Sequence, residues 1–323
     1  MKRLLYIVAA LAIITVLTLT AFSCAASARE SRSRKDAAPS NGRFVKAGDV
    51  EIYLQEAGSG TGAPVVFIHG TGAWSETWRD AMTALAGAGF RSVAIDLPPF
   101  GFSERPANAT YSLDAQAKRI VGVLDGLKIK DAILVGHSFG GGPTVEAALM
   151  ATDRIKSLVL VDVALGLDAG PGGPPAIQSF LLGITPLRDA VAAATVTNPM
   201  FTKRLLKAFI FNTAAATDAR VAIYQRPLAV EGTTKAVSSW VPTLLAPDQR
   251  AMSLNPKSYS KLKMPVSLIW GAEDTITPLS QAEHLKQLVP HAELSVLNGV
   301  GHIPQIEDPA RFNDVLLRFL RKQ

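Results

Sequence analysis

Cysteine is nearly absent from this chain, which has a single one, Cys24, among 323 residues. An internal disulfide framework is therefore excluded as a source of stability. Charged residues are also sparse at 19%, while 48% of the residues are hydrophobic. This balance is typical of a globular protein and excludes a mostly disordered or collagen-like chain. The length allows one large domain or two moderate ones.

The chain has little net charge beyond its first residues. Its formal net charge is +6, but residues 1–38 contain six of the 33 basic residues and two of the 27 acidic ones. The remaining chain has 27 basic and 25 acidic residues, a difference of +2. A nearly neutral body lacks the basic surface that nucleic acid requires, so no nucleic-acid partner is expected. The sequence also lacks metal-ligand clusters and glycine-rich nucleotide loops, so no metal or other cofactor is expected.

One long hydrophobic run is present, and it lies at the N-terminus. Two basic residues precede an uncharged run over residues 4–22, and small residues follow it. The run is longer than the usual core of a signal peptide, about 7–15 residues, and close to the roughly 20 that span a bilayer. Residues 1–28 are therefore predicted to be a signal peptide cleaved after Ala28 or a retained membrane anchor, with lipid attachment at Cys24 as a third alternative. We expect an exported or membrane-anchored protein whose folded domain lies outside the cytoplasm.

A hydrophilic segment separates this run from the rest of the chain. Residues 29–47 begin with a stretch rich in Ser, Arg, Ala and Pro that has nothing apolar to bury. Such composition is typical of a flexible linker, and we predict one here.

From residue 48 onward, short apolar runs alternate with longer helical patterns. Continuous apolar runs predict buried strands, and the stretches between them have helical periodicity. Buried strands separated by helices predict an α/β fold with a mostly parallel central sheet and helices on both faces. The expected strands are residues 50–55, 64–68, 91–95, 132–135, 157–161, 266–270 and 294–297, and the expected helices include 112–127, 140–151, 279–289 and 309–320.

About a hundred residues interrupt this alternation. Residues 164–263 have helical periodicity without a strand pattern, and a Gly/Pro cluster at 166–175 opens them. An insertion at this point predicts a helical cap over the carboxyl edge of the sheet, where ligands bind in open α/β folds. Residues 48–163 and 264–323 then form the core. The apolar content of the cap predicts an apolar pocket, with these aromatic candidates for its surroundings: Phe100, Phe102, Phe139, Phe180 and Trp240.

A serine lies in a motif with chemical meaning. The segment Gly-His-Ser-Phe-Gly at residues 136–140 follows a predicted strand and precedes a predicted helix. In that setting Gly-x-Ser-x-Gly forms a sharp turn that presents the serine at the edge of the sheet. The adjacent helix N-terminus favours negative charge. We therefore predict that Ser138 is a nucleophile rather than a surface serine in a tight turn.

A serine hydroxyl needs a general base to become nucleophilic. Three histidines follow Ser138 in the chain. His302 lies in a glycine-flanked loop just after the last predicted strand, where a base can reach the sheet edge, whereas His284 and His291 are expected on the surface. We predict that His302 is the base.

The base in turn needs a carboxylate to orient it. Asp274 lies in a turn-rich segment just after a predicted strand, and Asp162 ends the preceding strand. Both precede the base in the chain. We favour Asp274, and Asp162 remains an alternative.

Acyl transfer also needs N–H groups that stabilise a developing oxyanion. The N–H of Phe139, directly after the nucleophile, is the first predicted donor. The glycine-containing loop after residue 68 supplies the second, for which we choose Thr71 with Gly72 as the fallback. His69 is expected to hold this loop rather than to transfer protons.

From about residue 48 to 320, the chain resembles the α/β-hydrolase superfamily, in its capped serine-hydrolase branch of esterases, lipases and carbon–carbon bond hydrolases. The resemblance implies a triad of Ser138, Asp274 and His302, an oxyanion hole from Thr71 and Phe139, and a helical cap. Relatives with a nucleophilic aspartate are excluded, because that position is a serine here. The resemblance depends on five segments in order: His-Gly-Thr-Gly at 69–72, Asp-Leu-Pro-Pro-Phe-Gly-Phe-Ser at 96–103, Gly-His-Ser-Phe-Gly-Gly at 136–141, Gly-Ala-Glu-Asp at 271–274 and Gly-His at 301–302.

We therefore predict a serine hydrolase that cleaves carboxylic esters of small to medium apolar substrates through an acyl-enzyme on Ser138. His302 acts as base and Asp274 orients it. A small-molecule ester is the expected partner, with the membrane as a second one if the N-terminal segment is retained; the sequence leaves the oligomeric state open. Two alternatives remain. The same triad can hydrolyse a carbon–carbon bond or an amide, or the chain can be a membrane-tethered binding protein on a hydrolase scaffold.

Overall fold

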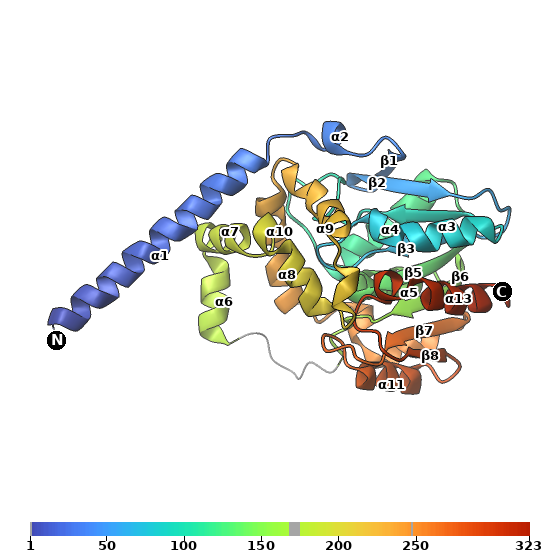
Figure 1. The fold of residues 1–323 in the computed structure, drawn as a ribbon. Helices are drawn as coiled ribbons and strands as arrows, with labels where there is room; N and C mark the ends of the chain where they lie inside the picture. The colour runs from blue at the N-terminus through green and yellow to red at the C-terminus, as the bar shows by residue number, and fades with distance from the viewer. Residues whose placement is uncertain (1, 168–174, 247) are drawn as a thin grey trace.

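A central sheet of eight strands organises the computed structural model, which describes residues 2–167, 175–246 and 248–323 (Figure 1). The strand order is β1-β2-β4-β3-β5-β6-β7-β8. The pairs β1–β2 and β2–β4 are antiparallel, and the remaining neighbours are parallel. The predicted α/β fold with a mostly parallel sheet is confirmed. The strands are β1 Gly42–Ala47, β2 Val50–Ala57, β3 Val65–Ile68, β4 Ser92–Ile95, β5 Ala132–His137, β6 Ile155–Val161, β7 Val266–Gly271 and β8 Glu293–Leu297.

Helices cover both faces of this sheet. Successive side chains of a strand point to opposite faces, so Val65 and Phe67 join one buried cluster while Val66 and Ile68 join the other. One cluster includes side chains of α3 (Arg79–Gly87) and α13 (Pro309–Leu320). The other includes side chains of α4 (Leu113–Gly126), α5 (Gly141–Met150) and α11 (Leu279–Leu288).

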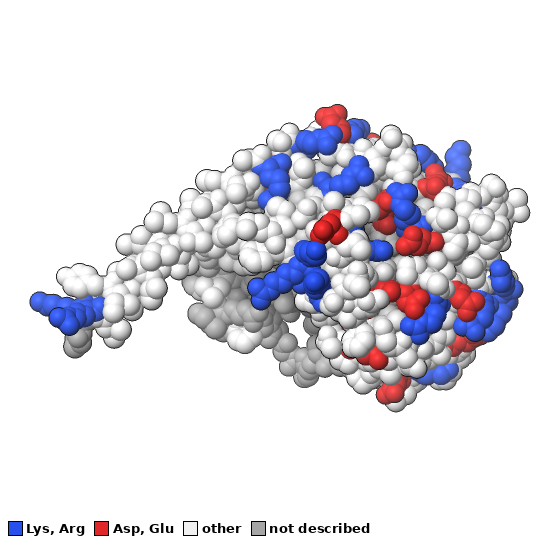
Figure 2. All heavy atoms as spheres, in the orientation of Figure 1, with Lys and Arg blue, Asp and Glu red and all other residues white. Residues whose placement is uncertain are grey.

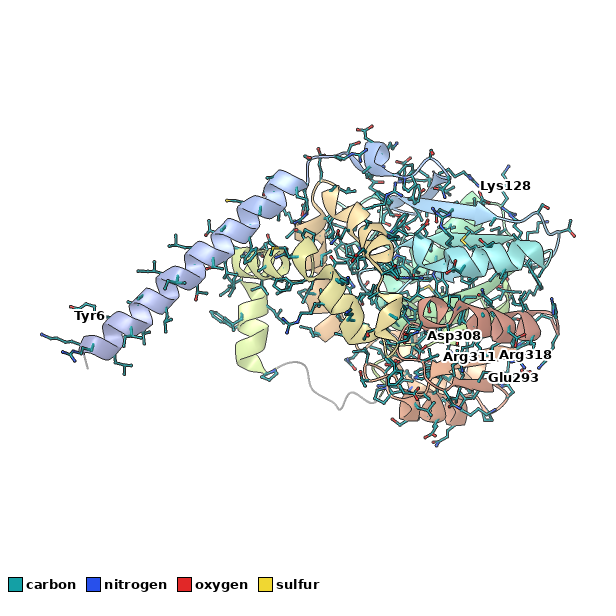
Figure 3. The ribbon with its side chains drawn as sticks, viewed as in Figure 1. Tyr6, Lys128, Glu293, Asp308, Arg311 and Arg318 are labelled. Atoms are coloured by element: carbon teal, nitrogen blue, oxygen red, sulfur yellow. The ribbon has the colours of Figure 1, made fainter. Side chains whose placement is uncertain are left out.

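The pattern of α13 shows why these segments form surface helices. Its buried residues, among them Phe312, Val315, Leu316 and Phe319, recur at helical spacing and form one apolar stripe. The side chain of Asp308 accepts a hydrogen bond from the N–H of Arg311 at 3.1 Å and so caps the first turn. Figure 3 labels Asp308, Arg311 and Arg318 along this helix.

In the described residues between β6 and β7, where the sequence predicts a cap, lie five α-helices, to which we refer as the cap: α6 Ala176–Gly183, α7 Thr185–Ala194, α8 Pro199–Phe209, α9 Asp218–Gln225 and α10 Thr233–Leu245. The described part of residues 164–263 is helical, but its last part belongs to the core. There η5 (Met252–Leu254) packs against α5, and η6 (Pro256–Lys261) packs against α11. The buried carboxylate of Glu146 in α5 fixes this segment, because it accepts the N–H groups of Met252 and Ser253 at 3.1 and 2.6 Å. The Gly/Pro cluster at 166–175 lies mostly outside the described residues.

Residues 29–47 do not form the flexible linker that their composition predicts. They contain a short helix, α2 (Arg34–Ala37), and the edge strand β1, which pairs with β2 along its whole length. The N–H of Arg32 donates to Ala229 of the cap at 3.1 Å, and the Arg34 guanidinium pairs with Glu51. Backbone hydrogen bonds and ion pairs hold this segment in place together with the burial of Ala37, Val45 and Ala47, so the prediction from composition is wrong.

The N-terminal run forms α1 (Lys2–Arg29), which projects from the cap (Figure 1). Leu19, Phe22 and Ser23 are partly buried and Ala26 is buried, at the spacing of one helical face, and α1 contacts α7. Farther out the helix is exposed, as at Tyr6, labelled near the tip in Figure 3. Among the described helices, α1 is the one with the length and apolar composition to cross a membrane.

Candidate active site

Ser138 stands in a strained turn between β5 and α5. Its backbone φ is 51°, a left-handed conformation that non-glycine residues rarely adopt. The flanking glycines are required by close approach. A Cβ on Gly136 would lie 2.5 Å from Thr144 Oγ1, and a Cβ on Gly140 would lie 2.3 Å from the carbonyl oxygen of His69. The turn therefore has the strained geometry that the Gly-x-Ser-x-Gly motif predicts.

The structure brings the three predicted side chains together. Ser138 Oγ lies 2.7 Å from His302 Nε2, and His302 Nδ1 lies 2.8 Å from Asp274 Oδ2. All three residues are buried. These contacts assign the tautomer: Nδ1–H donates to the carboxylate, and Nε2 accepts the serine proton. The arrangement can move a proton from the hydroxyl to the imidazole while the carboxylate stabilises the resulting cation.

Asp274 is held as an anion by several donors. Its Oδ1 accepts the N–H groups of Ile276 and Thr277 at 2.7 and 3.0 Å, and its Oδ2 accepts the Thr277 hydroxyl at 2.6 Å. Burial acts to raise the pKa of Asp274, but the hydrogen bonds from His302 and Thr277 outweigh it and lower that pKa. Thr277 escaped the sequence analysis, because a threonine three residues after a carboxylate is a common turn pattern with no chemical signature.

Asp162, the alternative acid, bonds to the backbone next to Asp274, whereas Asp274 itself contacts the base. It is fully buried, and its Oδ1 accepts the N–H of Gly271 at 2.9 Å. Burial, followed by the nearby charge of Asp274, raises the pKa of Asp162 well above its usual value. A carboxyl with a raised pKa is less suited to stabilise an imidazolium, and Asp274 is the acid that contacts His302, so the structure favours Asp274.

The loop after β3 lies directly against the serine. A Cβ on Gly70 would lie 2.8 Å from Ser138 Cβ, so only glycine fits there. Thr71 lines a small cavity together with Ser138 and His302. Phe139 follows the serine in the short helical turn η2 (Ser138–Gly140), at the N-terminal end of α5. Both predicted oxyanion donors therefore neighbour the serine.

His69 has the structural role that the sequence suggests. Its Nδ1 lies 2.8 Å from the carbonyl oxygen of Gly70, and its Nε2 accepts the N–H of Leu97 at 2.8 Å. The ring is fully buried, and this burial lowers the pKa of His69 to about 4. Both ring nitrogens are occupied, so the imidazole ties the loop after β3 to the loop after β4.

A carboxylate that the sequence analysis missed fixes the loop of the base. Glu307 Oε2 accepts the N–H groups of Phe211 and Asn212 in the cap at 2.8 and 2.9 Å, and that of Gly301 at 3.0 Å. Its Oε1 accepts the N–H of Ile303 at 3.1 Å. Glu307 ends the short helix α12 (Pro304–Glu307) and is buried. One side chain thus joins the cap to both neighbours of His302.

The cap also touches the base directly. The N–H of His302 donates to the carbonyl oxygen of Phe209, at the end of α8, at 3.1 Å. The ring of Phe209 lies 5.8 Å from the imidazole, centroid to centroid. The position of the base therefore depends on the cap as well as on the sheet.

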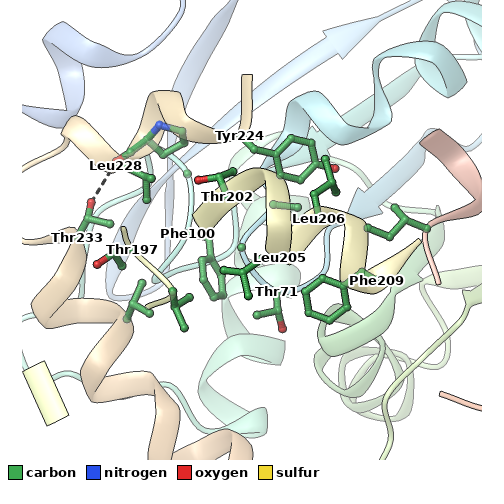
Figure 4. A pocket seen from close by; sticks show the side chains of 17 residues that line it. Thr71, Phe100, Thr197, Thr202, Leu205, Leu206, Phe209, Tyr224, Leu228 and Thr233 are labelled. Carbon is green, nitrogen blue, oxygen red and sulfur yellow. Dashed lines mark hydrogen bonds between the residues drawn. The ribbon is translucent and has the colours of Figure 1, made fainter. Parts of the chain in front are cut away.

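A cavity of about 150 Å³ adjoins the serine under the cap (Figure 4). It shares Thr71, Phe209 and Tyr224 with the smaller cavity that contains Ser138. Among the described residues that line the larger cavity, none is charged. Its walls are aliphatic, aromatic or Thr side chains, as Leu205, Leu206 and Phe100 show in Figure 4. The space suits an apolar group attached to the reacting carbonyl.

The five aromatic candidates have different surroundings. Phe100 lines the cavity, and Trp240 packs edge-on against Phe100 and Phe139 with centroid distances of 5.0 and 4.9 Å. Phe102 lies in the core, against Tyr53 and Trp74. Phe180 is 66% exposed on α6, so its assignment to the pocket is wrong.

The described residues contain no group of three or more His, Cys, Asp or Glu side chains placed to hold a metal ion. The other two histidines after the serine lie outside the site. His284 is on α11, and His291 Nε2 lies 3.0 Å from the carbonyl oxygen of Met264.

Comparison with known proteins identifies the class. The family model of the alpha/beta hydrolase fold matches residues 63–309, and the chain belongs to this family. It is 33% identical to the 2-hydroxymuconate semialdehyde hydrolase of Pseudomonas sp. strain CF600, over 87% of this chain and 94% of that protein. It is also 28% identical, with a TM-score of 0.69, to a crystal structure of the meta-cleavage product hydrolase of Pseudomonas fluorescens IP01, over 87% of this chain and 98% of that one.

A third similarity extends over α1. A crystal structure of a membrane phospholipase A matches 100% of this chain and 99% of its own, with a TM-score of 0.68 and 24% identity. At that identity the likeness concerns the fold alone. The comparisons thus support a hydrolase, and the 33% identical relative is named as a semialdehyde hydrolase rather than as a carboxylic ester hydrolase.

Proposed function

We propose that this protein is a serine-type hydrolase in which Ser138 attacks a carbonyl carbon of the substrate. The observation that carries the proposal is the chain of contacts from Ser138 Oγ to His302 Nε2 at 2.7 Å and from His302 Nδ1 to Asp274 at 2.8 Å. A hydroxyl within hydrogen-bond reach of an oriented imidazole is the arrangement that activates serine.

The reaction follows from these positions. As Ser138 Oγ bonds to the carbonyl carbon, its proton passes to His302 Nε2, and Asp274 stabilises the imidazolium. The N–H groups of Phe139 and Thr71 donate to the oxyanion of the tetrahedral intermediate. The leaving group departs with the proton from His302. Water then attacks the acyl-enzyme by the same route and releases the acid and free Ser138.

For the bond that breaks, the relatives favour a carbon–carbon bond. A carbon leaving group must depart as a stabilised carbanion and take a proton from His302, whereas an ester loses an alcohol. The 33% identical relative is a semialdehyde hydrolase and the similar crystal structure is a meta-cleavage product hydrolase. We therefore take hydrolysis of a carbon–carbon bond beside a ketone or aldehyde carbonyl as the first candidate.

Carboxylic ester hydrolysis is the second candidate, and one observation favours it. A substrate that carries a carboxylate, as the word muconate denotes, must pair its charge when buried. The described residues around the larger cavity include no charged side chain to do so. An uncharged ester fits this lining without an unpaired charge.

A direct comparison of substrates tests both candidates. The full chain would be assayed with a 2-hydroxy-6-oxo-dienoate and with nitrophenyl esters of increasing acyl length. Carbon–carbon hydrolysis predicts a higher kcat/KM for the dienoate, and ester hydrolysis predicts the reverse. Labelling with a fluorophosphonate separates both from a binding protein on the same scaffold. No labelling of Ser138 and no turnover of either class would contradict a hydrolase.

For the N-terminal segment we propose retention as a membrane anchor, with the folded domain outside the cytoplasm. Its support is the packing of α1 on the cap: Leu19 and Phe22 are partly buried, Ala26 is buried, and the helix contacts α7. Cleavage after Ala28 would remove the packed residue Ala26. The mass of the mature protein, measured on isolated membranes, tests retention, and a chain that begins at residue 29 would contradict it.

A further inference from the structure

Exposed apolar side chains are distributed unevenly over the molecule. Among the residues whose exposure the structure describes, the large hydrophobic ones with high exposure gather on α1 and on the cap, and the hydrolase core contributes two of them, Ile276 and Val296. Nine lie on α1: Leu4, Tyr6, Ile7, Val8, Leu11, Ile13, Ile14, Val16 and Leu17. Nine lie on the cap: Phe180, Leu181, Ile184, Val191, Val196, Met200, Phe211, Leu244 and Leu245.

The part of the cap nearest α1 combines this apolar exposure with an absence of outward charge. Figure 1 shows α6 and α7 at the end of the molecule from which α1 projects. Helix α6 has no charged residue, and α7 has two, Arg188 and Asp189. Both bond to the fully buried Ser238 of α10, the arginine at 3.0 Å. Their charges are thus directed into the cap, away from the surface with Phe180 and Ile184.

The length of the free part of α1 shows where a bilayer must lie. Leu19 is the first partly buried residue of α1, so the apolar segment 4–18 on its N-terminal side is free of the cap. Its fifteen residues span roughly 22 Å at about 1.5 Å each. The hydrocarbon core of a bilayer is about 30 Å thick. The missing 8 Å or so corresponds to the turns of α1 that pack against α7. Any tilt of the helix shortens the span further.

We infer that the outer surface of α6 and α7, with Phe180, Leu181, Ile184 and Val191, enters the bilayer beside α1 and contacts lipid acyl chains. The inference rests on the anchoring proposed above and adds a second lipid contact. Basic residues lie at the far tip of α1, at Lys2 and Arg3, and an uncharged stretch separates them from the cap (Figure 2). Insertion by about 5–10 Å is the depth at which apolar helix faces lie in an interface.

Insertion of this surface has a consequence for the substrate. The cavity beside Ser138 is lined from the cap by Val196, Leu205 and Leu206, directly after α7 and along α8. With α6 and α7 in the lipid, the cavity lies close to the bilayer surface. The substrate class that this placement favours is an apolar carbonyl compound dissolved in the membrane.

Fluorescence quenching at single sites tests the inference on the full chain. Cys24 is the sole cysteine and would first be replaced, Cys24→Ser. One cysteine would then be introduced in each of three variants, Phe180→Cys, Ile13→Cys and Val296→Cys, and labelled with an environment-sensitive dye. All three positions are exposed, so the fold should tolerate the change. The proteins would be reconstituted in vesicles of phosphatidylethanolamine and phosphatidylglycerol with a nitroxide on the acyl chain.

The expected result is several-fold stronger quenching by the lipid nitroxide at position 180 than at position 296, with the reverse for aqueous iodide. Position 13 reports on the anchor. If the nitroxide does not quench there, the anchoring proposal fails, and the present inference fails with it. If position 13 is quenched but position 180 responds to iodide like position 296, the inference alone is overturned. A label at 180 shielded from both quenchers overturns it in favour of a second copy of the chain. Turnover of a soluble substrate by the same samples reports separately on the hydrolase.

Discussion

The hydrolase core and the cap differ in how far their apolar side chains are buried. In the core, strand residues such as Val66 and Leu134 are fully buried, and the triad side chains at the sheet edge bond to one another. In the cap, apolar side chains such as Phe180 and Met200 are exposed at 66% and 81%. The contrast indicates a division of labour, in which the sheet edge positions the reacting groups and the cap determines access and surroundings. Each prediction below tests whether a residue of the core or of the cap has the role that this division assigns to it.

The largest effect is expected for Ser138→Ala. Without the nucleophile, kcat should fall by roughly a million-fold, while the fold and the cap stay intact. Steady-state kinetics and the loss of fluorophosphonate labelling measure this change, with circular dichroism as the control for folding. Labelling that persists in the variant would show that another residue is the nucleophile.

Next comes the comparison of the two buried acids. Asp274→Asn should lower kcat by about ten-thousand-fold, because the base loses its orienting anion. Asp162→Asn should cost less than about tenfold, because the neutral amide can accept the Gly271 N–H as Asp162 does. Asp162 has a φ of 42°, a conformation that asparagine tolerates. Equal losses at the two positions would place the triad acid elsewhere than we propose.

Glu307→Ala tests the connection between the two regions. Four N–H groups lose their acceptor, so the free energy of unfolding should fall by roughly 3 kcal/mol. Loosening of the His302 loop should also lower kcat by about tenfold or more. Urea unfolding and kinetics measure the two effects, with Glu283→Ala on α11, an exposed carboxylate, as the matched control. Lower stability with an unchanged kcat would show that the contacts of Glu307 with the cap do not affect the reaction.

Leu205→Trp tests the assignment of specificity to the cap. The larger side chain should fill part of the cavity and shift the ratio of kcat/KM for short over long acyl chains by about tenfold. The same substitution at Leu244, exposed at the end of α10, serves as the control and should leave that ratio unchanged. If Leu205→Trp lowers kcat/KM equally for short and long acyl chains, the long acyl chain does not occupy this cavity.

The smallest expected effect is a pH dependence of stability in the core. Burial lowers the pKa of His69 to about 4 in the folded chain, against about 6.5 in the unfolded chain. Between these two pH values the unfolded chain binds a proton at His69 that the folded chain does not bind. The contribution of His69 is complete above pH 6.5 and is lost as the pH falls towards 4, by at most about 1.4 kcal/mol per pH unit. The slope of the unfolding free energy against pH should therefore be smaller in His69→Gln. Equal slopes would show that the pKa of His69 does not differ between the folded and the unfolded chain.

Much of the core could be predicted because buried parallel strands are continuous apolar runs. The segments 64–68 and 132–135 correspond to β3 and β5. The edge strand β1 could not be predicted in this way, because Arg43 and Lys46 interrupt its apolar residues and its partner is the backbone of β2. Pairing of that kind leaves no signal in the composition of the strand itself.

The site shows the same limit. Ser138 and Asp274 follow β5 and β7, and His302 follows β8, so strand order was enough to predict that they meet at one edge. Glu307 and Thr277 act through contacts that only the folded chain defines. The prediction for Phe180 is wrong for a related reason. In a helix that is apolar on all sides, the sequence does not show whether an aromatic residue faces the protein or the solvent.

The hydrogen bond from the His302 N–H to the carbonyl oxygen of Phe209 couples the position of α8 to that of the base. Lifting α8 away from the sheet edge, which widens the route to the serine, breaks this bond and strains the Glu307 contacts. A molecule that is open for exchange of substrate and product therefore holds its imidazole less firmly. Any movement of α8 that admits substrate would therefore act on the imidazole as well.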